Sequence, residues 1–373
     1  MHILGKCQVC GKRSPLISDI LGVCLDCIRK RSQEAIEITK KVHATSRRAF
    51  CLPINVPRTP SGIRCGTCSN DCKIKPNLKG YCGLVTNTNN HLRRLGGIPE
   101  KGILNWYYDP LPTNCVAEWF CPGCTGVGYP TYAYRPNAET SYANLAVFYG
   151  ACSFDCLFCQ NWHYRFMSSK LQPTMSSREL ASKVRENVSC ICYFGGDPSV
   201  QMLHALETSR IALKEAKGNK RILRICWETN GYWKRELAIK AAEFSLFSGG
   251  VVKVDLKSWN NSLNIALCGV PNIPSLENIK AIGEKFFNKR SEVPVLTASS
   301  LLVPGYVDED EVANLSNFIA DIDTKIPYTL LAFSPQYMLT DLPTTSKDLA
   351  FRCYDIAKRN LEKVRIGNIL LLS

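Results

Sequence analysis

The sequence predicts an α/β protein in which a partial (β/α)6 barrel follows cysteine-rich, metal-binding N-terminal modules. From about residue 141 onward, apolar runs of strand length alternate with amphipathic stretches of helix length, as in repeated βα units. Before that point, cysteines recur at short spacings among many Gly, Pro and Asn residues, which favours metal sites and few long elements. We therefore expect a zinc-ribbon or rubredoxin-like module with four cysteines at 1–45, a cysteine-rich region at 46–140 and the barrel at 141–373.

Length and composition exclude several classes of protein. The chain has 373 residues and 45% hydrophobic residues, which suits a soluble protein with a large core. No apolar stretch of about 18 residues occurs, so we expect no membrane span. The first residues lack the apolar core of a secretory signal. Twenty cysteines without such a signal predict a cytoplasmic protein whose thiols bind metals rather than form disulfides.

The net charge favours acidic partners. Lysine and arginine total 46 against 32 acidic residues, a formal charge of +14. Long-range attraction of this kind suits nucleic acid, an acidic protein or an anionic cofactor. No recognisable RNA-binding signature accompanies the charge, and a generally basic surface is the alternative.

The first cysteine group consists of two knuckles separated by 13 residues, Cys7 with Cys10 and Cys24 with Cys27. Each short loop presents two thiolates to the same point, so the group predicts one tetrahedral metal. Zinc would make a structural ribbon, whereas iron would make a rubredoxin-like centre that passes electrons. Zinc is the first expectation because it requires folding as its only purpose. A polar helical stretch is expected to follow at 32–45.

Two further cysteine groups lie before the barrel. The second group is Cys65, Cys68, Cys72 and Cys82. Its four thiolates suit a zinc site or a second iron–sulfur cluster. The third group is Cys115, Cys121 and Cys124. Three ligands leave an open coordination position or a distant fourth partner, for which Cys51 is a candidate, and an auxiliary cluster touching substrate is an alternative.

The barrel is expected to contain six parallel strands with helices outside them. The strands are predicted near 144–150, 190–195, 221–227, 250–256, 295–302 and 328–333. The helices are predicted near 176–188, 199–216, 233–246, 275–288, 308–321 and 346–360. The tail at 364–372 is expected to add an edge strand. In such barrels the catalytic groups lie at the carboxyl ends of the strands.

A cysteine triad follows the first predicted strand. Cys152, Cys156 and Cys159 are spaced by three and two residues, with Phe158 between the last two. A [4Fe–4S] cluster takes one ligand per iron, so three thiolates leave one iron open. Chance proximity or zinc binding is the alternative. The segment resembles the cluster loop of radical S-adenosylmethionine (SAM) enzymes. The resemblance implies that SAM chelates the open iron and is cleaved reductively to a 5′-deoxyadenosyl radical.

Polar motifs follow the later strands and resemble the SAM contacts of that superfamily. They are Gly195, Gly196 and Asp197 after the second strand, Glu228 and Asn230 after the third, Asp255 and Lys257 after the fourth, and Ser300 at the fifth. The resemblance implies that the Gly-Gly segment bonds the amino group of SAM and that the Asp-x-Lys pair holds its ribose and carboxylate. An ordinary turn and exposed ion pairs are the alternatives. Some activating enzymes have a histidine near the position of Ser300, so its absence weakens any transfer of their substrate chemistry.

The remaining sequence features are expected to be structural. Five cysteines are predicted to be small buried residues: Cys190, Cys192, Cys226, Cys268 and Cys353. Cys268 is placed in a loop and is the one we would test as a thiol in catalysis. His163 is expected to make a local contact. The segment 333–343 resembles one of an activase-like branch, with a proline-bounded loop as the alternative. The catalytic residue itself stays unknown.

The resemblance covers roughly residues 65–340 and is closest to the activase-like branch related to pyruvate formate-lyase activating enzyme. Size and cysteine content are similar to those of archaeal glutamine C-methyltransferases of methyl-coenzyme M reductase. This implies a protein or peptide substrate, a low-potential electron donor, and either cobalamin-dependent C-methylation or activation of a glycyl-radical enzyme. No Asp-x-His-x-x-Gly cobalamin motif occurs, yet the added modules exceed a minimal activase, and we favour methylation.

A function from another class would be a basic zinc-ribbon scaffold that binds RNA or protein. The intact triad and the motifs at successive strand ends argue against it.

Overall fold

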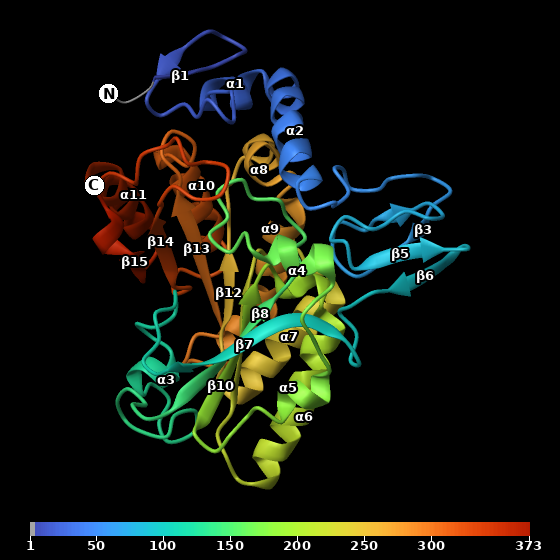
Figure 1. Cartoon of the computed structure of the whole chain (residues 1–373). Helices are drawn as coiled ribbons and strands as arrows, with labels where there is room; N and C mark the ends of the chain where they lie inside the picture. Colours follow the sequence, from blue (N-terminus) through green and yellow to red (C-terminus); the bar gives the residue numbers. More distant parts are fainter. Residues whose placement is uncertain (1–3) are drawn as a thin grey trace.

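The computed structural model describes residues 4–373 (Figure 1). The strands are β1 Gly5–Lys6, β2 Arg13–Ser14, β3 Ile63–Arg64, β4 Lys73–Ile74, β5 Val85–Thr88, β6 His91–Arg94, β7 Gly102–Pro110, β8 Ala143–Tyr149, β9 Thr174–Met175, β10 Val188–Gly195, β11 Arg224–Thr229, β12 Val252–Asp255, β13 Leu296–Leu302, β14 Tyr328–Ala332 and β15 Val364–Gly367. The α-helices are α1 Leu25–Lys30, α2 Ser32–Arg48, α3 Pro122–Thr125, α4 Tyr164–Lys170, α5 Ser177–Ala181, α6 Met202–Gly218, α7 Arg235–Ser248, α8 Asn261–Cys268, α9 Ile273–Phe286, α10 Glu309–Ala320 and α11 Lys347–Asn360.

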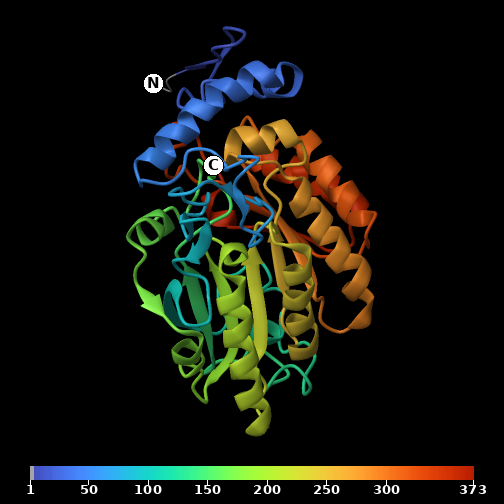
Figure 2. The same cartoon turned by 90° about the vertical axis from the view of Figure 1, so that its right-hand side faces the viewer.

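A nine-stranded sheet forms the body of the protein. Its order is β15-β14-β13-β12-β11-β10-β8-β7-β9. Strand β8 and strands β10 to β15 run parallel to one another. This arrangement confirms the six predicted strands and the edge strand of the tail. Parallel strands of this kind are buried on both faces, and the burial of Val188–Gly195 in β10 is nearly continuous. Figure 2 shows the helices lying against the outer face of the curved sheet.

The predicted barrel helices are all present, with two corrections. The helix expected at 176–188 ends at Ala181, because the chain must reach the start of β10 at Val188. The loop assigned to Cys268 was wrong: Cys268 is the last residue of α8, and Gly269 ends that helix with a φ of 77°. The helix α8 is too short for its apolar periodicity to show clearly in the sequence.

The strand β7 was missed in the region where few long elements were expected. It pairs antiparallel with β8 from Leu104 to Pro110 and extends the sheet beyond the barrel strands. The run Ile103-Leu-Asn-Trp-Tyr-Tyr108 is rich in apolar and aromatic residues, which is a strand signal. The density of cysteine, glycine and proline around it hid that signal.

The N-terminal module docks at the end of the barrel where the parallel strands finish (Figure 1). Tyr306, just after β13, donates to the carbonyl of Val23 at 2.9 Å. Arg29 pairs with Asp308 at 2.7 Å, and the Asp308 side chain also accepts from the backbone of α10 as its N-cap. The acidic residues at the start of α10 therefore both cap that helix and pair with the N-terminal module. None of the described helices is long and apolar enough to cross a membrane.

The fold also buries a neutral histidine beside the first barrel strand. His204 of α6 is fully buried, with Nδ1 2.8 Å from the Tyr149 hydroxyl and Nε2 3.0 Å from the carbonyl of Met175. Burial disfavours the charged imidazole and lowers the pKa of His204 to about 4.

We predict that the free energy of unfolding falls as the pH drops from about 6.5 towards 4, because the unfolded chain takes up a proton that folded His204 refuses. Urea unfolding at several pH values measures this slope. In His204→Gln the slope over this range should be shallower. An unchanged slope would assign the pH dependence to other groups.

Candidate active site at the carboxyl ends of the strands

A cavity of about 350 Å³ opens where the parallel strands end, and it gathers nearly every residue that the sequence singled out for the barrel. The predicted residues that line it are Cys152, Cys156, Cys159, Gly195, Gly196, Asp197, Glu228, Asn230, Asp255 and Lys257. They come from the ends of β10, β11 and β12 and from the loops after β8 and these strands, so neighbouring strands deliver them to one place. This volume suits a ligand of drug or nucleotide size.

The loop that carries the cysteine triad is held from behind by α8. The backbone N–H of Asp155 donates to the carbonyl of Cys268 at 2.9 Å, and that of Leu157 donates to Leu267 at 3.0 Å. Cys268 thus lies against the triad loop, beside Cys156, without lining the cavity. Its place is behind the candidate ligands rather than among them.

Asp155 is the central charge of this loop and has no exposed surface. It accepts from Arg165 of α4 at 2.8 Å and from Ser46 of α2 at 3.0 Å, and His43 Nδ1 lies 3.0 Å away. Burial by itself would raise the pKa of Asp155, but the bond from His43 and the charges of Arg165 and Arg47 outweigh it and lower the pKa. The triad loop is therefore fastened by ionic contacts to helices on both sides.

The two glycines at the end of β10, Gly195 and Gly196, are required by close approach to the segment that leads into the triad loop. A Cβ on Gly196 would lie 2.2 Å from the carbonyl oxygen of Ala151, and Gly195 has a φ of 107°. The backbone N–H of Gly196 donates to Tyr149 at 2.8 Å, and that of Asp197 donates to Ala151 at the same distance. No larger residue could bring this backbone so near the loop.

Asp197 lines the cavity and also links the ends of two neighbouring strands. Its carboxylate accepts from the backbone N–H groups of Ser199 at 2.7 Å and Asn230 at 2.6 Å, and from the hydroxyl of Thr229 at 3.1 Å. These bonds tie the end of β10 to the end of β11. Asn230 in turn directs its side-chain amide at Ser153 and Cys152, at 3.0 and 3.7 Å.

Two ion pairs face the cavity. Lys257 pairs with Oδ2 of Asp255, and its ammonium lies 5.7 Å from the ring centre of Phe158. Oδ1 of Asp255 is shielded from solvent and has no partner, so it is free to accept from a ligand hydroxyl. Glu228 pairs with the buried Lys253 at 2.8 Å, a partner that the sequence did not indicate.

Ser300 is the predicted barrel residue that the cavity does not include. It is fully buried, donates to the carbonyl of Leu256 at 2.7 Å and accepts from the Tyr328 hydroxyl at 2.9 Å. Successive side chains of a strand face opposite sides, and Ser299 and Leu301 line the cavity in its place. The sequence placed the right strand but the wrong face.

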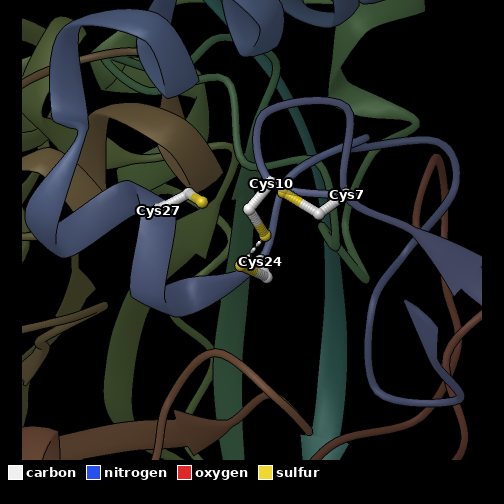
Figure 3. A group of neighbouring side chains, drawn as sticks. All are labelled: Cys7, Cys10, Cys24 and Cys27. Atoms are coloured by element: carbon white, nitrogen blue, oxygen red, sulfur yellow. Dashed lines mark hydrogen bonds between the residues drawn. The ribbon is translucent and has the colours of Figure 1, made fainter. Parts of the chain in front are cut away.

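The first cysteine group converges as expected (Figure 3). The sulfur atoms of Cys7, Cys10, Cys24 and Cys27 all lie within 4.8 Å of one another. Burial opposes ionisation of Cys7, but backbone N–H groups of the two knuckles donate to it and lower its pKa to about 6. This donor set fits one tetrahedral ion, zinc or iron.

The other cysteine groups are more widely spaced. Among residues 4–373, the four-cysteine group at the N-terminus is the only set that closes within 4.8 Å. In the second group, burial and the neighbouring Cys65 raise the pKa of Cys82 to about 12, and Tyr81 donates a backbone N–H to Cys72 at 3.4 Å. Cys51 lies exposed in the turn after α2. The metals of these groups stay predictions.

Sequence reasoning missed the residues that hold the site from outside the barrel. His43 and Arg47 lie one turn apart on α2, in a stretch interpreted only as a polar helix. Arg165 was not assigned a role. The sequence did contain a signal: Ala35, Thr39, His43 and Arg47 recur every four residues and so share one face of the helix. Polar side chains on a buried face need hydrogen-bond or ionic partners. The common partner of His43 and Arg47 lies far away along the chain and could not be read from the pattern.

Comparison with known proteins gives matches in sequence and structure. Residues 146–316 match the family model of the Radical SAM superfamily. An uncharacterized protein of Methanocaldococcus jannaschii is 27% identical over 313 residues, covering 82% of this chain and 81% of the relative. A putative glycyl-radical enzyme activating enzyme of the same organism is 23% identical over 217 residues, covering 57% and 76%. A domain of pyruvate-formate lyase-activating enzyme from Bacteroides vulgatus is 21% identical, with a TM-score of 0.36 over 45% of this chain and 93% of that one.

We predict that Asp155→Asn destabilises the protein by about 3–5 kcal/mol, because it leaves buried cations without their counter-charge. Urea unfolding near pH 7 measures the loss. Asp348→Asn, at an exposed surface pair, is the matched control and should change stability by less than about 1 kcal/mol. Similar effects of both substitutions would remove Asp155 from its structural role.

We predict that the purified chain carries one zinc ion at the N-terminal cysteines and that Cys10→Ala loses it, because three thiolates no longer close the tetrahedron. Elemental analysis measures the metal per chain. Cys51→Ala, at an exposed thiol outside the group, should keep the zinc. Iron at this site in the aerobically purified protein would instead establish a rubredoxin-like centre.

Proposed function

We propose that the chain, a radical SAM enzyme by the match of residues 146–316, abstracts hydrogen from a residue of a protein or peptide. The observation that carries the proposal is the convergence of the cysteine triad and the strand-end polar residues on one cavity. The relative named as an activating enzyme of a glycyl-radical enzyme supports a protein substrate.

The residues around the cavity fit an iron–sulfur cluster and SAM. Cys152, Cys156 and Cys159 would hold the cluster, and all three face the cavity where a fourth ligand can enter. When bound, the [4Fe–4S] cluster and SAM supply the reductive cleavage that yields a 5′-deoxyadenosyl radical. Lys257 offers a cation for the carboxylate of SAM, and the unpartnered Oδ1 of Asp255 accepts from a ribose hydroxyl.

The protein's own groups orient the ligand and exclude water. The Gly-Gly backbone packs against the residues that lead into the triad loop and lines the same cavity. Phe158 and Tyr164 line the same cavity and cover it with aromatic surface. Sheltering a reactive radical from solvent prevents its loss to side reactions. The electron donor is proposed to be an acidic, low-potential protein, since the chain carries a net charge of +14.

The finer proposal is carbon methylation of the substrate residue. Its support is the chain's organisation: the first two cysteine groups lie outside the cavity lining and exceed what radical formation uses. The cavity lining contains no histidine to act as an axial ligand of cobalt, so the described residues around it do not fit cobalamin by that route. We therefore derive no step through a corrinoid.

Activation of a glycyl-radical enzyme is the second candidate. The observation that favours it is the similarity to the relative of that name. Both candidates share hydrogen abstraction and differ in the fate of the substrate radical.

We predict that the anaerobically reconstituted full-length protein converts SAM to 5′-deoxyadenosine after dithionite reduction, and that Cys156→Ala abolishes this, because an iron loses its thiolate. Chromatography of the nucleoside measures it. Cys353→Ala, at a buried thiol of α11, should keep the activity. Equal activity in both variants would refute the triad's role.

The same reaction with methyl-deuterated SAM and a peptide digest separates the two candidates. A deuterated methyl group on a peptide carbon, found by mass spectrometry, supports methylation. A persistent glycyl radical on an added protein, seen by electron paramagnetic resonance, overturns methylation in favour of activation.

A further inference from the structure

A second cavity of about 100 Å³ lies next to the first, towards the interior of the barrel, and cysteines dominate its chemistry. The cysteines that line it are Cys115, Cys121, Cys190, Cys192 and Cys226. Five residues line both cavities: Asn114, Cys115, Phe194, Glu228 and Lys253. The two cavities are therefore direct neighbours.

The fold explains why these thiols meet. Cys190 and Cys192 stand two residues apart on β10 and face the same side of the sheet. Cys192 lies opposite Cys226 in the register of β10 with β11. Cys115 and Cys121 come from the loop that leads into α3, the short helix at the lower left of Figure 1. Two strands and one loop thus deliver thiols that are far apart in the sequence.

A buried cation points at this group. The ammonium of Lys253, 4% exposed, lies 3.1 Å from the sulfur of Cys192 and 3.6 Å from that of Cys115. The ammonium is therefore placed to donate to both sulfur atoms, as donors around metal-bound sulfur do.

Ordinary packing does not account for the group. The interiors of such barrels are usually filled by branched aliphatic side chains, which need no charged neighbour. Here thiols surround a cavity, beside Lys253 and beside Arg224, whose guanidinium is paired with Glu139 at 2.6 Å. Lys253 is also paired with Glu228 at 2.8 Å, and its contacts to two sulfur atoms are what distinguishes this group from an aliphatic core.

The spacing of the thiols is wider than that of a set gathered around a single ion. Within the described residues, this group does not close within 4.8 Å, unlike the four N-terminal cysteines. The triad of Cys152, Cys156 and Cys159 does not close either. Thiolates that hold separate irons of one cluster must stand farther apart than thiolates that share one ion.

We propose that the second cavity binds an iron–sulfur cluster of its own, ligated by Cys115, Cys121, Cys192 and Cys226. This proposal goes beyond the proposed function and does not rest on it, since the second cavity has its own cysteines and does not include the triad. Each thiol gives its proton to solvent as its sulfur binds iron. Lys253 donates to two of the ligands, and Cys190 lies beside them without being required.

The test uses the full chain with Cys152, Cys156 and Cys159 all changed to alanine, so that neither the triad cluster nor SAM cleavage contributes. After anaerobic reconstitution with iron and sulfide, acid-labile sulfide per chain is measured. Adding Cys192→Ala and Cys226→Ala should remove the sulfide of one cluster. Adding Cys353→Ala instead, at a buried thiol elsewhere, should leave the sulfide unchanged.

Equal sulfide in the two variants would overturn the proposal, and so would zinc in place of iron and sulfide at this site. If the double change does not fold, Cys226→Ala alone, at the half-buried member of the set, carries the same comparison. The electron paramagnetic resonance signal of the reduced triad-free chain should also stay the same when SAM is added. A SAM-dependent change would contradict a fully ligated cluster.

Discussion

The candidate site depends on a single buried charge. Asp155 lies inside the triad loop with no exposed surface, and residues of α2 and α4 hold it from two sides. A carboxylate this deep is tolerated only because cations and hydrogen-bond donors surround it. The positions of the three cysteines are thus set by helices outside the barrel. Because α2 follows directly on the N-terminal knuckles, the first module is part of the architecture of the site rather than an appendage.

The alternation of side chains along the strands divides the barrel interior into zones. Near the carboxyl ends, inward-facing positions carry Glu228, Asp255 and Ser299, which line the larger cavity. Two positions earlier, the inward residues are Cys226 and Lys253. Side chains at the outward positions, such as Ser300, make hydrogen bonds to neighbouring strands. A shift by one residue exchanges these roles, so the register of β13 determines which serine can reach a ligand.

The sequence predicted the sheet well, and the residues that it singled out meet in one cavity, because both outcomes depend on local signals. Apolar runs define strands, and motifs that follow parallel strands must meet at one edge. It did not predict partners that are distant in sequence. Asp155 meets His43 and Arg165, and Lys253 meets Cys115, only through the fold. The proposed role of Cys192 and Cys226 as ligands could not be predicted either. A buried cysteine on a strand has the same local sequence pattern whether it packs in the core or binds a metal.

The pair of Glu228 and Lys253 joins the two cavities electrostatically. Lys253 contacts sulfur atoms of the smaller cavity and the carboxylate of Glu228, which also lines the larger one. In a buried setting, charges a few ångströms apart interact far more strongly than they do in water. Any negative charge placed among the thiols therefore competes with Glu228 for the same ammonium. Glu228 and Lys253 line both cavities, so the two cavities share one ion pair.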